Sequence, residues 1–257
     1  MTEFTNRRIL ITGASKGLGR AAAVRFARDG AEIIINYNRG QRDGEETLRQ
    51  VEAAGGRGTM VQGNIGNPDD VTRIWDVSCT GGTIPSVLVL NAAFQKKATV
   101  VDTDLALLRE TLEVNVVGNF GLAKRFMESH RQGRTPGTLV IHSSNQAEFV
   151  NPTGFAYALS KAALNHMVRH LARAGVKDGI RVNGVLLGWF NTEGERDFYS
   201  AEQIEEQAKT AVPMQRAGRP EEAANMAYFL ASEQSSYMTG SLVRFDGGFS
   251  LDPDLST

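Results

Sequence analysis

A tyrosine and a lysine stand four residues apart in the segment YALSK, at Tyr157 and Lys161. Residues with this spacing face the same side of a helix. A free phenol has a pKa of about 10, and a neighbouring cation favours the phenolate. Tyr157 could therefore take a proton from an alcohol or give one to a carbonyl group near neutral pH. A hydride transfer to or from a nicotinamide needs this proton transfer, but the spacing alone is a weak signal.

Apolar runs of strand length alternate along the chain with segments of helical period. Unbroken Val, Ile and Leu runs are typical of strands that are buried on both faces of a parallel sheet. The sequence predicts one domain over residues 1–257, a doubly wound α/β fold whose ligands bind beyond the carboxyl ends of the strands. The runs are ILI (9–11), EIIIN (32–36), TMVQ (59–62), SVLVL (86–90), TLVIH (138–142), RVNGVLL (181–187) and SLVRF (241–245).

The composition excludes several classes of protein. The net charge of −1 gives no electrostatic reason to expect nucleic acid or an anionic membrane as a partner. The single cysteine, Cys79, can form neither an internal disulfide nor a thiolate metal site. Because we find no signal peptide and no apolar stretch of about 18 residues, we expect a cytoplasmic protein.

The segment TGASKGLG, Thr12–Gly19, follows the first predicted strand and begins a predicted helix. Its glycines permit a tight turn, and the helix N-terminus offers free N–H groups to a pyrophosphate. In this context the segment predicts a dinucleotide site.

The glycine spacing is G-x-x-x-G-x-G, which differs from the G-x-G-x-x-G form. With the other motifs, it makes the chain similar over nearly its whole length to the short-chain dehydrogenases/reductases of about 250 residues, which share a Rossmann-like fold. The other motifs are LNAA at 90–93 (NNAG in the family), Asn115 in LEVNVVGNF, SS at 143–144, YALSK, RVNGVLLGWFNT (VN-x-x-x-PG-x-x-x-T in the family) and FDGG at 245–248.

The resemblance implies four catalytic residues. Ser144 would hydrogen-bond the substrate oxygen, with Ser143 as its structural neighbour. Tyr157 would transfer the proton, Lys161 would also hold the nicotinamide ribose, and Asn115 would anchor a proton-relay water. Because relatives are commonly dimers or tetramers, and the helix from Phe155 to Val176 has a wide apolar stripe, we expect a homo-oligomer.

The cofactor preference depends on the end of the second predicted strand. The segment INYNRG lacks the carboxylate that binds the ribose of NAD, and Arg39 with Lys16 could bind a 2′-phosphate. We therefore favour NADP(H), with NAD(H) as the alternative if Arg39 is only a solvated surface residue. The predicted cofactor residues are Gly13, Ser15, Lys16, Gly17, Leu18, Gly19, Tyr37, Asn38, Arg39, Asn64, Ile65, Asn91, Ala92, Ala93, Tyr157, Lys161, Gly188 and Thr192.

Two positions depart from the family pattern. Leu187 replaces a proline, which predicts a less constrained backbone before Gly188. Ala93 replaces a glycine and adds a methyl group beside the cofactor or substrate. Neither change removes a catalytic group.

The substrate class is the least determined property. Polar side chains near the expected substrate loop at 188–213 favour a small sugar-like or polyol-like molecule, whose ring Trp189 could cover. These polar residues are Asn145, Gln146, Glu148, Asn151, Asn191, Glu193 and Glu195, and the tentative substrate ligands are Ser144, Gln146, Asn151, Trp189 and Glu193.

Two other functions stay open. A 3-oxoacyl-[acyl-carrier-protein] reductase could dock its carrier on the basic cluster of Lys124, Arg125, Arg131 and Arg134. The chain could also be a dinucleotide-binding sensor without catalysis.

No metal site is predicted. His166 and His170 are four residues apart on a helix, but the sequence places no glutamate at position 167 and no third ligand near them.

Overall fold

A parallel sheet forms the centre of the molecule. The computed structural model describes residues 3–194, 196 and 198–251. Within these residues seven strands pair in the order β3-β2-β1-β4-β5-β6-β7, so the predicted doubly wound Rossmann-like fold is confirmed, and each predicted apolar run lies within a strand or extends one residue beyond it. The strands are β1 Arg8–Ile11, β2 Glu32–Tyr37, β3 Arg57–Gln62, β4 Val87–Leu90, β5 Gly137–Ser144, β6 Ile180–Leu187 and β7 Leu242–Phe245.

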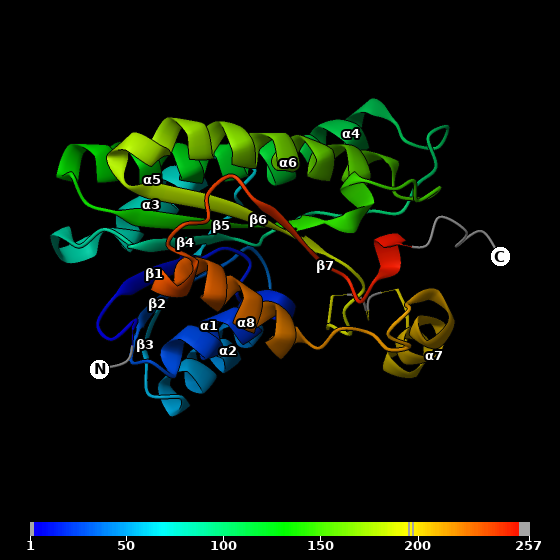
Figure 1. The fold of residues 1–257 in the computed structure, drawn as a ribbon, viewed down its shortest axis with the longest axis horizontal. Helices are drawn as coiled ribbons and strands as arrows, with labels where there is room; N and C mark the ends of the chain where they lie inside the picture. The colour runs from blue at the N-terminus through cyan, green and yellow to red at the C-terminus, as the bar shows by residue number, and fades with distance from the viewer. Residues whose placement is uncertain (1–2, 195, 197, 252–257) are drawn as a thin grey trace.

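Helices cover both faces of this sheet (Figure 1). One layer contains α3, α5 and α6, and the opposite layer contains α1, α2 and α8, with α1 packed against both of its neighbours. The helix α7 lies beyond the end of β7, away from both layers. The helices are α1 Gly17–Ala27, α2 Gln41–Ala53, α3 Pro68–Ser78, α4 Leu105–Leu112, α5 Asn119–Gly133, α6 Phe155–Gly175, α7 Ala201–Ala211 and α8 Pro220–Ala231.

Each central strand contributes to two cores because successive side chains point to opposite faces. In β1, Ile9 and Ile11 pack in the core under α1 and α8, whereas Leu10 packs in the core under α3, α5 and α6. This is why an uninterrupted apolar run, rather than an alternating one, marks these strands.

The strand order reverses between β1 and β4, which lie side by side in the sheet. Ligands of doubly wound sheets bind in the crevice at this point, beyond the carboxyl ends of the strands. The glycine loop follows β1, LNAA includes the end of β4, Ser144 ends β5 and Gly188 follows β6. The topology thus brings the predicted motifs to one edge of the sheet.

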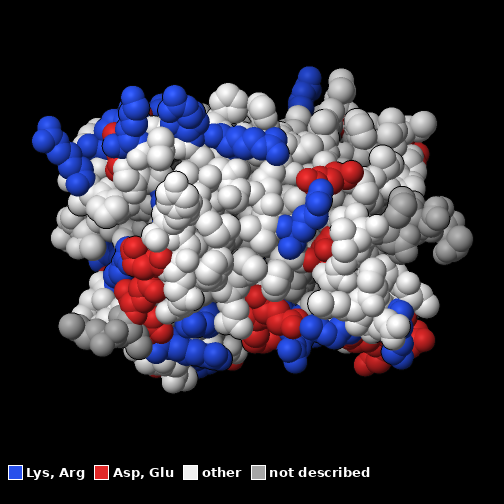
Figure 2. Space-filling view, in the orientation of Figure 1, with Lys and Arg blue, Asp and Glu red and all other residues white. Residues whose placement is uncertain are grey.

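The surface of the α5/α6 layer carries exposed apolar side chains, among them Val117, Phe120 and Leu159. They agree with the wide stripe that suggested a subunit interface, and the oligomeric state stays a prediction. Figure 2 shows Lys and Arg side chains along the upper margin of the molecule, where α5 and α6 lie, and mixed charges along the lower margin. Within the described part of the chain, no helix is both long and apolar enough to cross a membrane.

Candidate active site

The side chains of Tyr157 and Lys161 lie together on the first two turns of α6. The ammonium nitrogen of Lys161 is 5.3 Å from the centroid of the Tyr157 ring. Lys161 is 3% exposed, and its Nζ donates a hydrogen bond to the backbone oxygen of His142, 2.8 Å away. Burial lowers the pKa of Lys161 to about 8. A partly desolvated cation therefore stands beside the phenol.

The two serines that end β5 point to opposite sides. Ser143 donates to the Oδ1 of Asn165 on α6 at 2.6 Å, inside the protein. Ser144 lines the same cavity as Tyr157, and its Oγ accepts a hydrogen bond from the backbone N–H of Gln146 at 3.2 Å. The alternation of side chains along a strand thus gives Ser144, and not Ser143, access to a ligand.

Asn115 lies, fully buried, in a π-helical turn at Glu113–Gly118. Its Oδ1 accepts from the backbone N–H of Phe94 at 2.6 Å, and its Nδ2 donates to Phe94 O and Ser160 Oγ, both at 2.9 Å. Both amide N–H groups are therefore used inside the protein. The side chain ties the loop after β4 to α6, so a relay water would have to bind other atoms of this turn.

Backbone conformation and lack of space explain the three glycines of the glycine loop. Gly13 and Gly17 have φ of +61° and +58°, in the left-handed region. A side chain at Gly19 would place its Cβ 2.3 Å from the backbone oxygen of Gly13. Asn91 holds the loop, because its Nδ2 donates to Thr12 O and Gly13 O at 2.9 and 3.0 Å.

Glu193, which was predicted as a tentative substrate ligand, lies against this loop and is not among the residues that line the cavity beside Tyr157. Its carboxylate accepts hydrogen bonds from the backbone N–H of Gly17 at 3.0 Å and from Arg20 Nη1 at 2.9 Å. An anionic group thus already occupies the N-terminus of α1. The loop therefore fits a pyrophosphate, for which this carboxylate is a stand-in.

The other predicted cofactor residues surround this loop. Lys16 is the N-cap of α1, and Thr192 is buried over Gly17. At the end of β2, Asn38 and Arg39 are exposed. Tyr37 is buried, and its ring lies beside Gly44 of α2.

Several predicted positions have structural contacts of their own. The backbone oxygen of Ser15 accepts from Arg20 and from Thr47 Oγ1, and the Oδ1 of Asn64 accepts from Gly66 N at 3.0 Å. Leu18 packs against the core under α1, and Ala92 packs against the core under α3, α5 and α6. Ile65 is buried, whereas Ala93 is exposed.

Only a glycine fits at position 188, directly after β6, because the backbone of Asp246 lies against it. A Cβ at Gly188 would lie 2.5 Å from the Cα of Asp246 in the FDGG segment. Leu187 is buried and pairs with Ser144 on one side and Phe245 on the other. Strand pairing thus constrains the backbone that a proline constrains in the family pattern.

A cavity of about 730 Å³, the Tyr157 cavity, opens beside these groups. Of the predicted substrate residues, Ser144, Gln146, Asn151 and Trp189 line it, as do Asn145 and Glu148. Asn191 does not, because its Nδ2 donates to Glu205 Oε1 on α7 at 2.9 Å. Glu195 lies outside the described residues.

Sequence reasoning missed several residues of the Tyr157 cavity. The sequence indicated some of them only by position, since the segment at 188–213 was expected near the substrate. Which of their side chains face the ligand depends on loop geometry. The missed residues include Gln95, Lys97, Phe149, Val150, Tyr199, Arg244 and Phe249.

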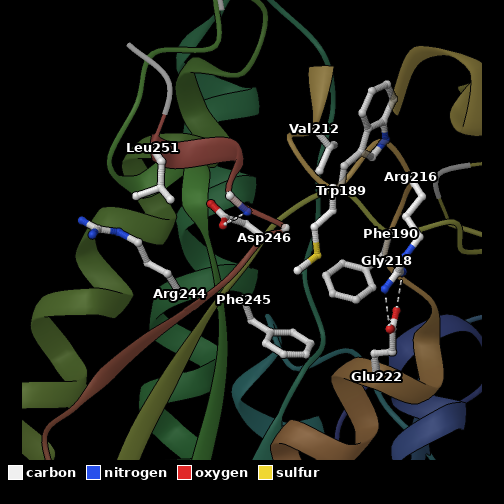
Figure 3. Close-up of a pocket in the computed structure, with 13 residues that line it drawn as sticks. Trp189, Phe190, Val212, Arg216, Gly218, Glu222, Arg244, Phe245, Asp246 and Leu251 are labelled. Carbon is white, nitrogen blue, oxygen red and sulfur yellow. Dashed lines mark hydrogen bonds and ion pairs between the residues drawn. The ribbon is translucent and has the colours of Figure 1, made fainter. Parts of the chain in front are cut away.

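Figure 3 shows a second cavity, of about 410 Å³. It shares Trp189 and Arg244 with the Tyr157 cavity. Its wall is mostly apolar, with Phe190, Phe245 and Val212, and the ion pair between Arg216 and Glu222 borders one side at 2.8 Å. Ser144, Tyr157 and Lys161 are not among the residues that line it. Of these two cavities, Ser144 and Tyr157 therefore line only the Tyr157 cavity.

The basic cluster on α5 is largely engaged within the chain. Arg125 donates to Thr72 Oγ1 at 2.6 Å, Arg131 pairs with Asp178 at 2.8 Å, and Lys124 lies 3.7 Å from Glu128. Arg134 caps the C-terminus of α5.

The two neighbouring histidines of α6 contact one another. The Nε2 atoms of His166 and His170 are 3.1 Å apart. Among the residues that the structure describes, no group of three or more His, Cys, Asp and Glu side chains could hold a metal ion.

Comparisons with known proteins agree with this geometry. Residues 13–250 match a family model described as enoyl-(acyl carrier protein) reductase. The chain is 30% identical over 252 residues to glucose 1-dehydrogenase 2 of Bacillus subtilis (strain 168), covering 98% of this chain and 97% of that protein. It is also 30% identical over 252 residues to 3beta-hydroxysteroid dehydrogenase 1 of Eggerthella lenta, covering 98% and 96%.

A solved structure has the same fold. The crystal structure of a short-chain type dehydrogenase/reductase from Mycobacterium marinum superposes with a TM-score of 0.91 at 28% identity, and the match covers 97% of this chain and 98% of that one.

Proposed function

The chain belongs to the short-chain dehydrogenase/reductase family, and from this premise we propose that it transfers a hydride between NADP(H) and a small, hydroxylated alcohol or carbonyl compound. The family membership makes it an oxidoreductase that acts on CH–OH groups with NAD or NADP. The preference for NADP(H), the roles of individual residues and the sugar-like or polyol-like substrate are proposals.

One observation carries the catalytic assignment. The ammonium of Lys161 lies 5.3 Å from the ring centroid of Tyr157, and Tyr157 shares its cavity with Ser144. A phenol, a cation and a hydroxyl group meet at the edge of the sheet where a dinucleotide binds. A binding protein without catalysis has no need of all three.

Tyr157 and Ser144 have separate roles in the proposed reaction. When bound, the nicotinamide accepts or supplies the hydride. Tyr157 takes the proton from the substrate hydroxyl during oxidation and returns it during reduction. Ser144 is free to donate to the substrate oxygen, because its Oγ accepts from Gln146 N and its distance of 3.5 Å to Asn145 Oδ1 is long for a hydrogen bond.

Lys161 orients the cofactor and favours the phenolate. Its Nζ is fixed by the backbone oxygen of His142, which leaves two N–H groups without a partner among the described residues. These donors can reach the nicotinamide ribose. Its positive charge stabilises the deprotonated form of the neighbouring phenol.

The preference for NADP(H) rests on the residues after β2. Arg39 and Asn38 are exposed there, and the last residues of β2 are Asn36 and Tyr37, neither of which is an acid. A guanidinium can bind a 2′-phosphate with charge-assisted hydrogen bonds. NAD(H) remains the alternative.

The lining of the Tyr157 cavity supports a hydroxylated substrate. Amide side chains of Gln95, Asn145, Gln146 and Asn151 line this cavity, and their N–H and C=O groups that have no partner within the chain can pair with hydroxyl groups, whereas an apolar chain offers these groups no partner. Each such loss costs about 1–3 kcal/mol. Two relatives that are each 30% identical to this chain are named for a sugar and for a steroid, so sequence similarity does not identify the substrate.

A 3-oxoacyl-[acyl-carrier-protein] reductase is the second candidate, since the matched family model carries a related name. The intrachain contacts of Lys124, Arg125 and Arg131 weaken the case for a carrier-docking surface.

A panel of sugars, polyols and 3-oxoacyl thioesters, assayed with NADP(H) and with NAD(H), tests the proposal. We expect turnover of hydroxylated members. A thioester whose specificity constant exceeded that of every sugar and polyol by about a hundredfold, or about 2.7 kcal/mol, would contradict the substrate class. NADP(H) binding without turnover of any member would instead favour the sensor.

A further inference from the structure

The loop after β4 places a lysine in the wall of the Tyr157 cavity. The Nζ of Lys97 donates a hydrogen bond to the hydroxyl of Tyr199, 2.7 Å away. The same nitrogen lies 4.0 Å from the centroid of the Tyr199 ring and 4.8 Å from that of Phe198. Two aromatic side chains from the segment after β6 therefore hold the ammonium in position.

The backbone beside Lys97 is fixed to the start of the catalytic helix. Ala98 donates from its N–H to the backbone oxygen of Thr153 at 2.9 Å and forms an isolated parallel bridge with Gly154. Gly154 is the N-cap of α6, on which Tyr157 lies. Lys97 and Tyr157 are thus tied to one segment of backbone, so a substrate bound to one is held in a defined position relative to the other.

None of the described residues that line the cavity neutralises the charge of Lys97. Among these residues the other charged side chains are Arg244 and Glu148, which pair with each other at 2.8 Å. Within the described part of the chain, the contacts of the Lys97 ammonium are a hydroxyl group and two aromatic rings, all of them neutral. These contacts orient the ammonium and use one of its three N–H donors.

We propose that the Tyr157 cavity takes a polyhydroxylated carboxylic acid, whose carboxylate binds Lys97 while a secondary alcohol or ketone reacts at Tyr157. The proposal rests on the proposed function and names its substrate class. In the oxidation, the alcohol carbon gives a hydride to NADP⁺ and its hydroxyl gives a proton to Tyr157, so the products are the ketone, NADPH and one proton. The carboxylate keeps all of its atoms.

Sets of three compounds that share one carbon chain test this assignment. Each set contains an aldonate, its aldonamide and the corresponding alditol, which differ in charge but keep the hydroxyl groups. We expect the wild-type enzyme to prefer the aldonate. Lys97→Met keeps most of the apolar stem and should lower kcat/KM for the aldonate by about ten- to hundredfold, the loss of one charge-assisted hydrogen bond.

The control is Lys96→Met, which removes a lysine one residue away that is exposed and is not among the residues lining the cavity. It should leave all three activities unchanged. The loss in Lys97→Met should lie mainly in KM, and the amide and the alditol should change by less than about threefold. Tyr199→Phe keeps the ring but not the hydroxyl group, and should lower the aldonate activity by a smaller factor.

Calorimetry of the NADP(H)-loaded protein separates this proposal from the proposed function. Aldonate binding that is lost in Lys97→Met, weakened by salt and kept in Lys96→Met supports the carboxylate site, even if no compound of the panel is turned over. In that case the proposed function alone fails. Equal aldonate binding by wild type and Lys97→Met overturns the carboxylate site, as does equal wild-type use of the aldonate and the aldonamide.

Discussion

The side-chain carboxylate of Glu193 accepts a hydrogen bond from the backbone N–H of Gly17, with the two atoms 3.0 Å apart across 176 positions of sequence. The contact joins the segment after β6 to the N-terminus of α1. A backbone N–H at such a helix start binds phosphate groups well. If the pyrophosphate of the cofactor binds at this N–H, as we propose, the Glu193 carboxylate competes with it.

We expect Glu193→Gln to bind NADP(H) more tightly than wild type. The change removes a negative charge from the site that a dianionic pyrophosphate enters, and the expected gain is about three- to tenfold in Kd, or about 1 kcal/mol. Fluorescence titration of the cofactor measures it. Glu206→Gln on the exposed side of α7 is the control, and an unchanged or weaker Kd in Glu193→Gln would show that the carboxylate does not compete.

Tyr157→Phe should lose turnover by about 10²–10⁴-fold while it still binds the cofactor, because the variant keeps the ring and loses only the group that carries the proton. Steady-state rates with the best substrate, together with the Kd for NADP(H), check both parts. A turnover rate in Tyr157→Phe close to that of wild type would show that Tyr157 does not transfer the proton.

Removal of the Arg39 side chain should separate the two cofactors. Arg39→Ala should raise the Michaelis constant for NADPH far more than that for NADH, because only NADPH has the 2′-phosphate. The two constants are measured in one assay with each reduced cofactor. An equal change in both would mean that Arg39 does not bind phosphate.

His142 should make the folded protein sensitive to acid. Burial, and then the charge of Lys161, lowers the pKa of His142 to about 3 from its ordinary 6.5. Its Nδ1–H donates to Asn91 Oδ1, since the Nδ2 of Asn91 is itself a donor to the glycine loop, and its Nε2 has no partner among the described atoms. The folded protein therefore keeps this histidine neutral.

The sign of the pH dependence follows from proton binding. Between pH 6.5 and about 3 the unfolded chain binds a proton at His142 that the folded protein does not, so the free energy of unfolding falls as the pH falls, by up to about 1.4 kcal/mol per pH unit. Urea unfolding of wild type and His142→Met at several pH values isolates this effect. The stability difference between the two proteins should shift in favour of the variant below pH 6.5, and a difference independent of pH would contradict it.

The strands and the contact between Tyr157 and Lys161 could be predicted because their signals are local. An apolar run such as TLVIH needs burial on both faces wherever it lies, and β5 contains it. Tyr157 and Lys161 meet because one helix carries both, so their spacing alone gives the geometry. The alternation of a strand likewise separates Ser143 from Ser144.

Contacts between distant loops could not be predicted in the same way. Glu193 belongs to a polar segment whose composition suits a substrate loop, and it binds Gly17 instead. Asn191 faces α7, and Lys97 enters the cavity while its neighbour Lys96 is exposed. In a loop no fixed period relates position to direction, so a one-residue shift changes which side chain meets the ligand.

By itself, the sequence determined the parallel sheet, the glycine loop, the family and the pairing of Tyr157 with Lys161, because each depends on residues that are neighbours in the chain or on the burial of one run. The tertiary structure alone decided which side chains line the Tyr157 cavity and that Glu193 binds at the helix N-terminus. Those arrangements depend on how loops from β4, β5 and β6 pack over one edge of the sheet. There, hydrogen bonds between segments far apart in the sequence, and not local preference, fix each position.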